Sequence, residues 1–125
     1  MTAHEKTSQD SKDLCDLLFV ALQQAIPHLQ RSDNIGSCGL YQEGRTRFAY
    51  IHHSNTHIEI WCRGDVDELK RHDYGLGVMP RVRQRPGWEK NFPAYFQISS
   101  VGQLATAVSL LTDVSLAASK RKSYV

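Results

Sequence analysis

The clearest pattern at the start of the chain is an apolar residue at every third or fourth position between residues 14 and 29. These positions are Leu14, Leu17, Leu18, Ala21, Leu22, Ala25, Ile26 and Leu29. Such spacing places one apolar stripe along a helix. We predict a helix that begins at Asp10 or Ser11, either of which would cap it, and that is kinked or ended near Pro27.

The middle of the chain alternates between apolar and polar residues, which is typical of antiparallel strands. Residues 31–37 (RSDNIGS) are rich in turn formers, and we expect a loop there. Strands are predicted over 38–43, 46–52 and 57–63, joined by short polar turns. In the second strand Phe48 and Tyr50 are expected to share one face. In the third strand one face is expected to hold Ile58, Ile60 and Cys62.

The second half of the chain contains two further helix patterns. Asp65 and Glu68 have the spacing of a capping box, so a short helix is predicted over about 66–72. Residues 78–92 contain two prolines and a glycine, which favour an extended edge strand or an ordered loop. A strand is expected over 92–98. The last helix would be capped by Ser99 or Ser100, with a buried stripe of Val101, Leu104, Ala107, Val108, Leu111 and Val114 or Ser115.

This order of elements predicts a single α+β domain over residues 1–125, with flexible ends at 1–9 and 119–125. An antiparallel sheet of about four strands has one face that must be covered. The amphipathic helices at the two ends of the chain are the natural cover. The predicted architecture is therefore a two-layer sandwich.

The composition agrees with a small globular domain. Of the 125 residues, 41% are hydrophobic and 22% are charged. The polar N-terminus lacks the apolar stretch of a signal peptide, and no apolar run approaches the length of a spanning helix, so we expect a cytoplasmic protein without a membrane partner. The three cysteines, Cys15, Cys38 and Cys62, have no CxxC spacing and are expected to be reduced interior thiols.

The positive charge is more informative in its distribution than in its total, which is only +2. In an extended segment, Arg81, Arg83 and Arg85 would project to one side, and such guanidinium groups suit phosphate oxygens. A nearby tryptophan could stack on bases. The sequence therefore predicts a polyanion-binding surface made of Arg63, Arg81, Arg83, Arg85, Trp88 and Lys90. The alternative is a charged, proline-containing edge strand that only prevents aggregation.

Signs of a metal or catalytic site are weak. His57 and Glu59 match the His-x-Glu of zinc deaminases, but the chain lacks the Pro-Cys-x-x-Cys that completes that site. His52 and His53 are adjacent on a predicted strand and would point to opposite faces. We therefore predict no catalytic residue, no metal ligand and no cofactor.

Two short stretches resemble the paired strand motifs of the GIY-YIG endonucleases. They are Gly39-Leu40-Tyr41 and Tyr50-Ile51-His52. The second departs from the family at His52, where glycine is expected. A strand also follows, where the family has a helix bearing its arginine. A metal-dependent nuclease is kept as the weakest hypothesis.

A wider resemblance covers residues 40–115. RTRFAYI (45–51), IEIW (58–61) and FQISSVGQLATAVSLL (96–111) are together similar to a small bacterial domain of unknown function. Some of its members are described as predicted transport proteins, and others are fused behind restriction-type nuclease modules. The resemblance implies an α+β fold, an accessory or binding role and no established catalytic residue. Residues 81–90 have no counterpart in it.

Together these patterns predict a binding module rather than an enzyme. Its ligand would be a polyanion, with nucleic acid first and an acidic protein second, in a defence or restriction context. The alternative is a protein-interaction or homodimer module, for which Trp61, Trp88 or Tyr95 would supply the contacts.

Overall fold

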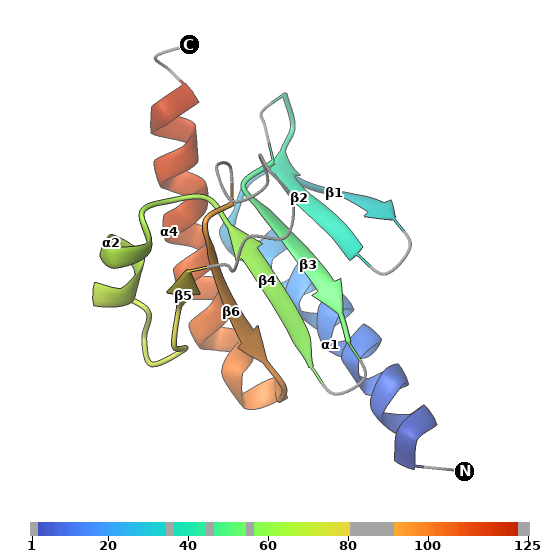
Figure 1. Cartoon of the computed structure of the whole chain (residues 1–125). Coiled ribbons are helices and arrows are strands. Elements are labelled where there is room, and N and C mark those ends of the chain that lie inside the picture. Colours follow the sequence, from blue (N-terminus) through green and yellow to red (C-terminus); the bar gives the residue numbers. More distant parts are fainter. Residues whose placement is uncertain (1–2, 35–36, 45–46, 55–56, 81–91, 123–125) are drawn as a thin grey trace.

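The computed structural model describes residues 3–34, 37–44, 47–54, 57–80 and 92–122. Figure 1 shows the elements in chain order: α1 (Ala3–Ala25), β1 (Leu29–Asn34), β2 (Ser37–Gln42), β3 (Ala49–His53), β4 (Ile58–Cys62), α2 (Val66–Arg71), β5 (Met79–Pro80), β6 (Ala94–Ile98), the 3-10 turn η1 (Val101–Gln103) and α4 (Leu104–Lys122). None of the helices in these ranges is long and apolar enough to cross a membrane.

The strands form one antiparallel sheet. Its spatial order is β1-β2-β3-β4-β6-β5, and all neighbouring strands run in opposite directions. The α+β class and the antiparallel sheet are thus confirmed. The expected number of strands, about four, is wrong, because the sheet has six strands. One edge strand, β1, was not expected. The other, the two-residue β5, lies at the start of residues 78–92, for which an edge strand or a loop was predicted.

Strand β1 corrects the loop that was expected over residues 31–37. It pairs along its whole length with β2, from Leu29 opposite Gln42 to Asn34 opposite Ser37. An edge strand has only one neighbour, so it tolerates polar residues that would be costly in the centre of a sheet. Pairing with β2 therefore outweighs the turn propensity of the sequence RSDN.

The core lies on one face of the sheet, which we call the inner face. Its fully buried side chains come from the central strands and from both long helices: Leu18, Leu22, Leu40, Ile51, Ile58, Ile60, Phe96, Ile98, Leu110 and Leu111. In Figure 1, α1 and α4 lie together behind the sheet. Because side chains alternate along a strand, the residues between these core positions project from the opposite face, which we call the outer face.

The alternation predicted for the third strand is confirmed, whereas the placement of Phe48 on the same face as Tyr50 is wrong. Ile58, Ile60 and Cys62 are all 0% exposed. Phe48 is also buried in the core, although it was expected to share a face with Tyr50. Phe48 precedes β3, which begins only at Ala49, so strand alternation does not apply to it.

Both long helices extend beyond their predicted limits. Helix α1 begins at Ala3 rather than at Asp10 or Ser11, and α4 continues to Lys122. Leu17 and Val101, which were expected in buried stripes, are 48% and 65% exposed. The apolar stripe of α1 that packs in the core is therefore narrower than its leucine content suggests.

The two predicted helix caps have different outcomes. At α2, Oδ1 of Asp65 accepts hydrogen bonds from the backbone N–H groups of Asp67 (2.9 Å) and Glu68 (3.2 Å), as the capping pattern predicts. Ser100 occupies the N-cap position of η1 but makes no capping hydrogen bond through its side chain. Instead, Oε1 of Gln103 accepts a hydrogen bond of 2.8 Å from the backbone N–H of Ser99.

The Asp65 cap provides a direct test of the α2 assignment. We expect Asp65→Ala to lower the free energy of unfolding by about 1 kcal/mol, because two backbone donors lose their acceptor. Urea unfolding followed by circular dichroism would measure the change. Asp65→Asn is the matched control, since asparagine caps helices about as well as aspartate. Equal destabilisation by both substitutions would contradict the capping role.

Candidate functional site

Aromatic side chains from four strands share the outer face of the sheet. They are Tyr41 on β2, Tyr50 on β3, Trp61 on β4 and Tyr95 on β6. Tyr50 lies directly opposite Trp61, and Trp61 lies directly opposite Tyr95. All four side chains are partly exposed. The sheet therefore presents a band of rings that runs across its strands.

The indole of Trp61 is held by its neighbours. The His52 ring lies against it, with 3.6 Å between the ring centroids. Nε1 of Trp61 donates a hydrogen bond of 2.6 Å to Oε1 of Glu59. Gln97 on β6 reaches the other oxygen of Glu59 at 3.5 Å. These contacts restrict the orientation of the indole, so Glu59 and His52 act as supports for the aromatic band.

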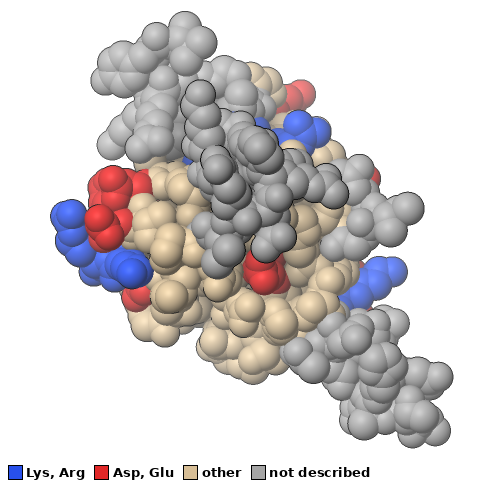
Figure 2. All heavy atoms as spheres, in the orientation of Figure 1, with Lys and Arg blue, Asp and Glu red and all other residues tan. Residues whose placement is uncertain are grey.

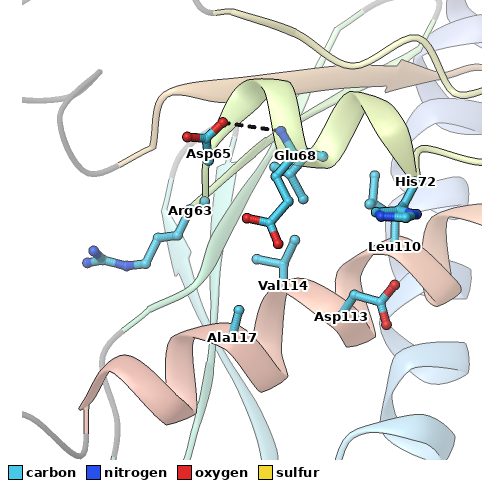
Figure 3. Close-up of a pocket in the computed structure, with 10 residues that line it drawn as sticks. Arg63, Asp65, Glu68, His72, Leu110, Asp113, Val114 and Ala117 are labelled. Atoms are coloured by element: carbon cyan, nitrogen blue, oxygen red, sulfur yellow. Dashed lines mark hydrogen bonds between the residues drawn. The ribbon is translucent and has the colours of Figure 1, made fainter.

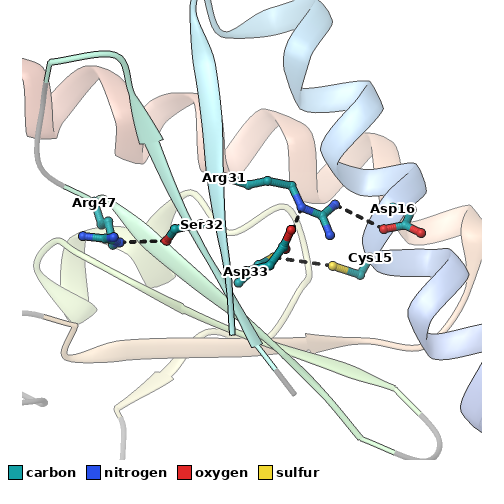
Figure 4. A network of polar contacts seen from close by, with 7 residues as sticks. Cys15, Asp16, Arg31, Ser32, Asp33 and Arg47 are labelled. Carbon is teal, nitrogen blue, oxygen red and sulfur yellow. Dashed lines mark hydrogen bonds and ion pairs between the residues drawn. The ribbon is translucent and has the colours of Figure 1, made fainter. Parts of the chain in front are cut away.

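Arg47 lies across the surface of β2 at one end of the band. Its Cζ is 5.5 Å from the centroid of the Tyr41 ring. Its Nε donates a hydrogen bond of 3.1 Å to Oγ of Ser32, as Figure 4 shows. Gly39 allows this close approach, because a Cβ at that position would be 2.8 Å from Cδ and Nε of Arg47. The glycine thus makes room for a cation flat against the sheet.

Arg63 follows β4 and provides a second cation near the band. Its Nε donates a hydrogen bond of 2.6 Å to the carbonyl oxygen of Arg47. Its Cζ is 4.8 Å from the centroid of the Phe92 ring. Phe92 in turn meets the Tyr50 ring edge-on, with 5.0 Å between centroids. This chain of contacts connects the two arginine positions to the aromatic residues of the central strands.

Of the six predicted ligand-binding residues, only Arg63 lies within the described residues. Arg81, Arg83, Arg85, Trp88 and Lys90 lie outside them. The described residues before and after this segment are close to the outer face. Met79 pairs with Tyr95 across the β5–β6 ladder, and Phe92 contacts Tyr50. The predicted basic segment therefore connects two points beside the aromatic band.

The histidines noted in the sequence are placed separately. His52 lies against Trp61, whereas Nδ1 of His57 is 3.0 Å from Oγ of Ser54. Within the ranges described above, no group of three or more histidine, cysteine, aspartate or glutamate side chains is arranged to hold a metal ion. β4 also follows β3, where the GIY-YIG pattern requires a helix.

A small pocket lies between α2 and α4, beside Arg63. Its volume is about 100 Å³, and it is lined by Arg63, Gly64, Asp65, Glu68, Leu69, His72, Leu110, Asp113, Val114 and Ala117. Figure 3 shows the guanidinium of Arg63 extending away from the other lining side chains. Pockets that enclose drug-sized ligands usually have volumes of about 300–1,000 Å³. We therefore place the candidate site on the outer face.

Charged groups on the visible surface are unevenly distributed. In Figure 2 they gather over α2, whereas most of the described surface in the middle of this view is uncharged. Among the described residues, Arg47 and Arg63 lie beside the aromatic band, over the Tyr41 and Phe92 rings.

Comparison of the chain with protein-family models, curated proteins and solved structures found no match. The two resemblances seen in the sequence therefore stay predictions. Trp61 and Tyr95 were expected from the sequence as exposed contacts, but their grouping with Tyr41, Arg47 and Tyr50 was not. Alternation along each strand indicates which side chains face outward. The register between strands, which the sequence does not give, decides which of them are neighbours.

Proposed function

We propose that the protein is a non-enzymatic module that binds single-stranded nucleic acid on the outer face of its sheet. The observation that supports this most directly is the band formed by Tyr41, Tyr50, Trp61 and Tyr95 on four strands. Arg47 lies over the Tyr41 ring of this band, and Arg63 lies over the neighbouring Phe92 ring. The proposal takes α1 and α4 as the layer that backs the sheet. The aromatic band then forms the binding surface.

Aromatic rings on a sheet suit single strands for a physical reason. Unpaired bases expose their flat faces, and stacking on a protein ring contributes about 1–3 kcal/mol per base. Bases inside a duplex are already stacked on each other and present only their edges. Duplex DNA is therefore expected to bind much more weakly to this surface than a single strand of the same length.

The arginines supply the second part of the interaction. Arg47 and Arg63 each place the guanidinium group over a ring. A guanidinium group carries five N–H donors, which suit phosphate oxygens. Phosphate contacts of this kind give affinity without reading the base sequence. The predicted contacts from Arg81, Arg83, Arg85 and Lys90 would add to the same electrostatic contribution.

Tyrosine replacements test the stacking surface. Tyr41→Ala and Tyr95→Ala are each expected to weaken binding about tenfold, because each removes one stacking surface. Fluorescence anisotropy with a labelled oligothymidine of about 16 nucleotides would measure the dissociation constants. Tyr74→Ala is the matched control, since Tyr74 is 56% exposed and its hydroxyl group is hydrogen-bonded to Asp113 rather than lying on the outer face.

The control also defines the result that would reject the proposal. Tyr74→Ala is expected to leave the affinity unchanged. If all three tyrosine variants bind as the wild type does, the outer face is not the contact surface. If the wild-type protein binds no oligonucleotide but forms a dimer that is insensitive to salt, the protein-interaction hypothesis replaces this one.

A further inference from the structure

Two thiols meet between α1 and β2, on the side of the sheet away from the proposed nucleic-acid surface. Sγ of Cys15 lies 3.7 Å from Sγ of Cys38. The two residues are 0% and 1% exposed, and both are free thiols. Figure 4 shows Cys15 on the helix, turned toward the strands. The spacing of the cysteines in the sequence gave no indication of this pair.

An ion-pair network surrounds the two thiols. Nη1 of Arg31 is 3.1 Å from Oδ1 of Asp16, and Nε of Arg31 donates a 2.9 Å hydrogen bond to Oδ1 of Asp33. Asp16 follows Cys15 in α1, and Asp33 lies opposite Cys38 in the β1–β2 ladder. The network therefore joins α1, which carries Cys15, to β1, the strand that pairs with the Cys38 strand.

The two thiols differ in acidity. A hydrogen bond from Cys15 lowers the pKa of Cys38 below its ordinary value, and the charge of Arg31 acts in the same direction. The same contact, together with burial, raises the pKa of Cys15. We therefore take Cys38 as the thiol that reacts first in the proposal below. Burial alone raises the pKa of the third cysteine, Cys62, to about 12.

We propose that Cys15 and Cys38 are a redox modification site, which forms a reversible intramolecular disulfide when the protein meets hydrogen peroxide. The sulfur atoms are already in contact, and bond formation requires them to approach to about 2.05 Å. The bond would join α1 covalently to β2. Disulfides that form in reducing compartments are usually transient and redox-sensing, in agreement with the expected cytoplasmic location.

Both thiols are buried, so the proposal requires a transient local opening between α1 and β2 that admits the peroxide. The reaction then proceeds in two balanced steps. The Cys38 thiolate attacks one oxygen of the peroxide, the O–O bond breaks, and Cys38 becomes a sulfenic acid while the released hydroxide takes up a proton to form water. The sulfur of Cys15 then attacks the sulfur of Cys38. The S–S bond forms, the S–O bond breaks, and the leaving hydroxide takes the proton of Cys15 as a second water. The two thiols together supply the two electrons that reduce the peroxide.

Peptide mapping tests the proposal directly. The reduced protein is treated with hydrogen peroxide, its remaining thiols are alkylated, and it is digested with trypsin without a reductant. We expect peptide 13–31 linked to peptide 32–45, with Cys62 alkylated in peptide 48–63. Dithiothreitol should separate the linked peptides. The same peroxide treatment of the chain in urea is the control for effective oxidation. If that control is oxidised while all three cysteines of the folded protein are alkylated, the proposal is overturned. A disulfide to peptide 48–63, which carries Cys62, would also overturn it.

Two variants and a stability measurement separate this site from general oxidation. Cys62→Ala should form the same bond as the wild type, and Cys38→Ala should form no intramolecular bond. Oxidation should raise the midpoint of thermal unfolding by about 10 °C in the wild type and in Cys62→Ala, because the bond restricts the unfolded chain. An increase of the same size in Cys38→Ala would show that the effect does not come from this pair.

Discussion

Replacing Phe96 by alanine is expected to lower the free energy of unfolding by about 3–5 kcal/mol. Phe96 is 1% exposed and lies directly opposite Ile60 in the β4–β6 ladder. Truncation removes a buried ring and leaves a cavity. The neighbouring strands β4 and β5 cannot close this cavity without breaking their pairing with β6. Urea unfolding followed by circular dichroism measures the loss.

Neighbouring positions on β6 provide the controls for this prediction. Gln97 is exposed, and Gln97→Ala is expected to change stability by at most about 0.5 kcal/mol. Tyr95 is half-buried on the outer face, so Tyr95→Ala should cost less than Phe96→Ala. A register shift of one residue would exchange the two faces of the strand. A larger loss from Tyr95→Ala than from Phe96→Ala would therefore contradict the assignment of the faces.

A loss of this size is a large part of the stability of a small domain, which is about 5–15 kcal/mol. If the alanine variant does not fold, Phe96→Leu gives the same information, because leucine retains part of the apolar volume. We expect Phe96→Leu to be less stable than the wild type and Gln97→Ala. It should be more stable than Phe96→Ala. Wild-type stability in Phe96→Leu together with a folded, stable Phe96→Ala would mean that this ring is not a core residue.

The parts of the fold that sequence predicts well are those in which burial follows a regular period. Leu14, Leu18 and Leu22 recur at helical spacing, and all are buried in α1. Ile58 and Ile60 alternate with polar and amphipathic residues, and both are buried in β4. In each case a single element must bury one side, so local spacing contains the answer.

The edge of the sheet formed by β1 could not be predicted in the same way. Strand β1 is held by its backbone pairing with β2 and by the contacts of Arg31 with Asp16 and Asp33. Neither interaction requires apolar residues at regular spacing, so neither can be recognised from the sequence pattern. Turn formers at residues 31–34 therefore favoured a loop when the sequence was taken alone.

The candidate site shows a similar division. Alternation within β4 already separates Trp61 from Ile60, so a solvent-facing tryptophan could be expected from sequence. The placement of Arg47 over Tyr41, and of Phe92 against Tyr50, depends on which strands are neighbours. The Cys15–Cys38 contact joins residues 23 positions apart, on a helix and a strand. Such contacts cannot be predicted from the spacing of residues along the chain.

Replacing Arg81, Arg83 and Arg85 together by glutamine is expected to flatten the salt dependence of nucleic-acid binding. Each phosphate contact to a single strand contributes about 0.7 to the slope of log affinity against log salt concentration. Loss of three such contacts would lower the slope by about 2. Anisotropy titrations of the labelled oligothymidine between about 50 and 200 mM salt cover the range in which this change is large.

The matched control removes three positive charges from another part of the molecule. Lys12 on α1 and Lys70 and Arg71 on α2 are all exposed, and their joint replacement by glutamine gives the same change in net charge. If the arginines bind phosphates, only the Arg81/Arg83/Arg85 variant loses slope, whereas a general attraction by net charge would lower both slopes equally. The slope could instead be unchanged in the arginine variant while Tyr41→Ala still weakens binding. The aromatic band would then be the contact surface, and Arg81, Arg83 and Arg85 would not bind phosphates. The two experiments thus separate stacking from phosphate contact, which the proposal combines in one surface.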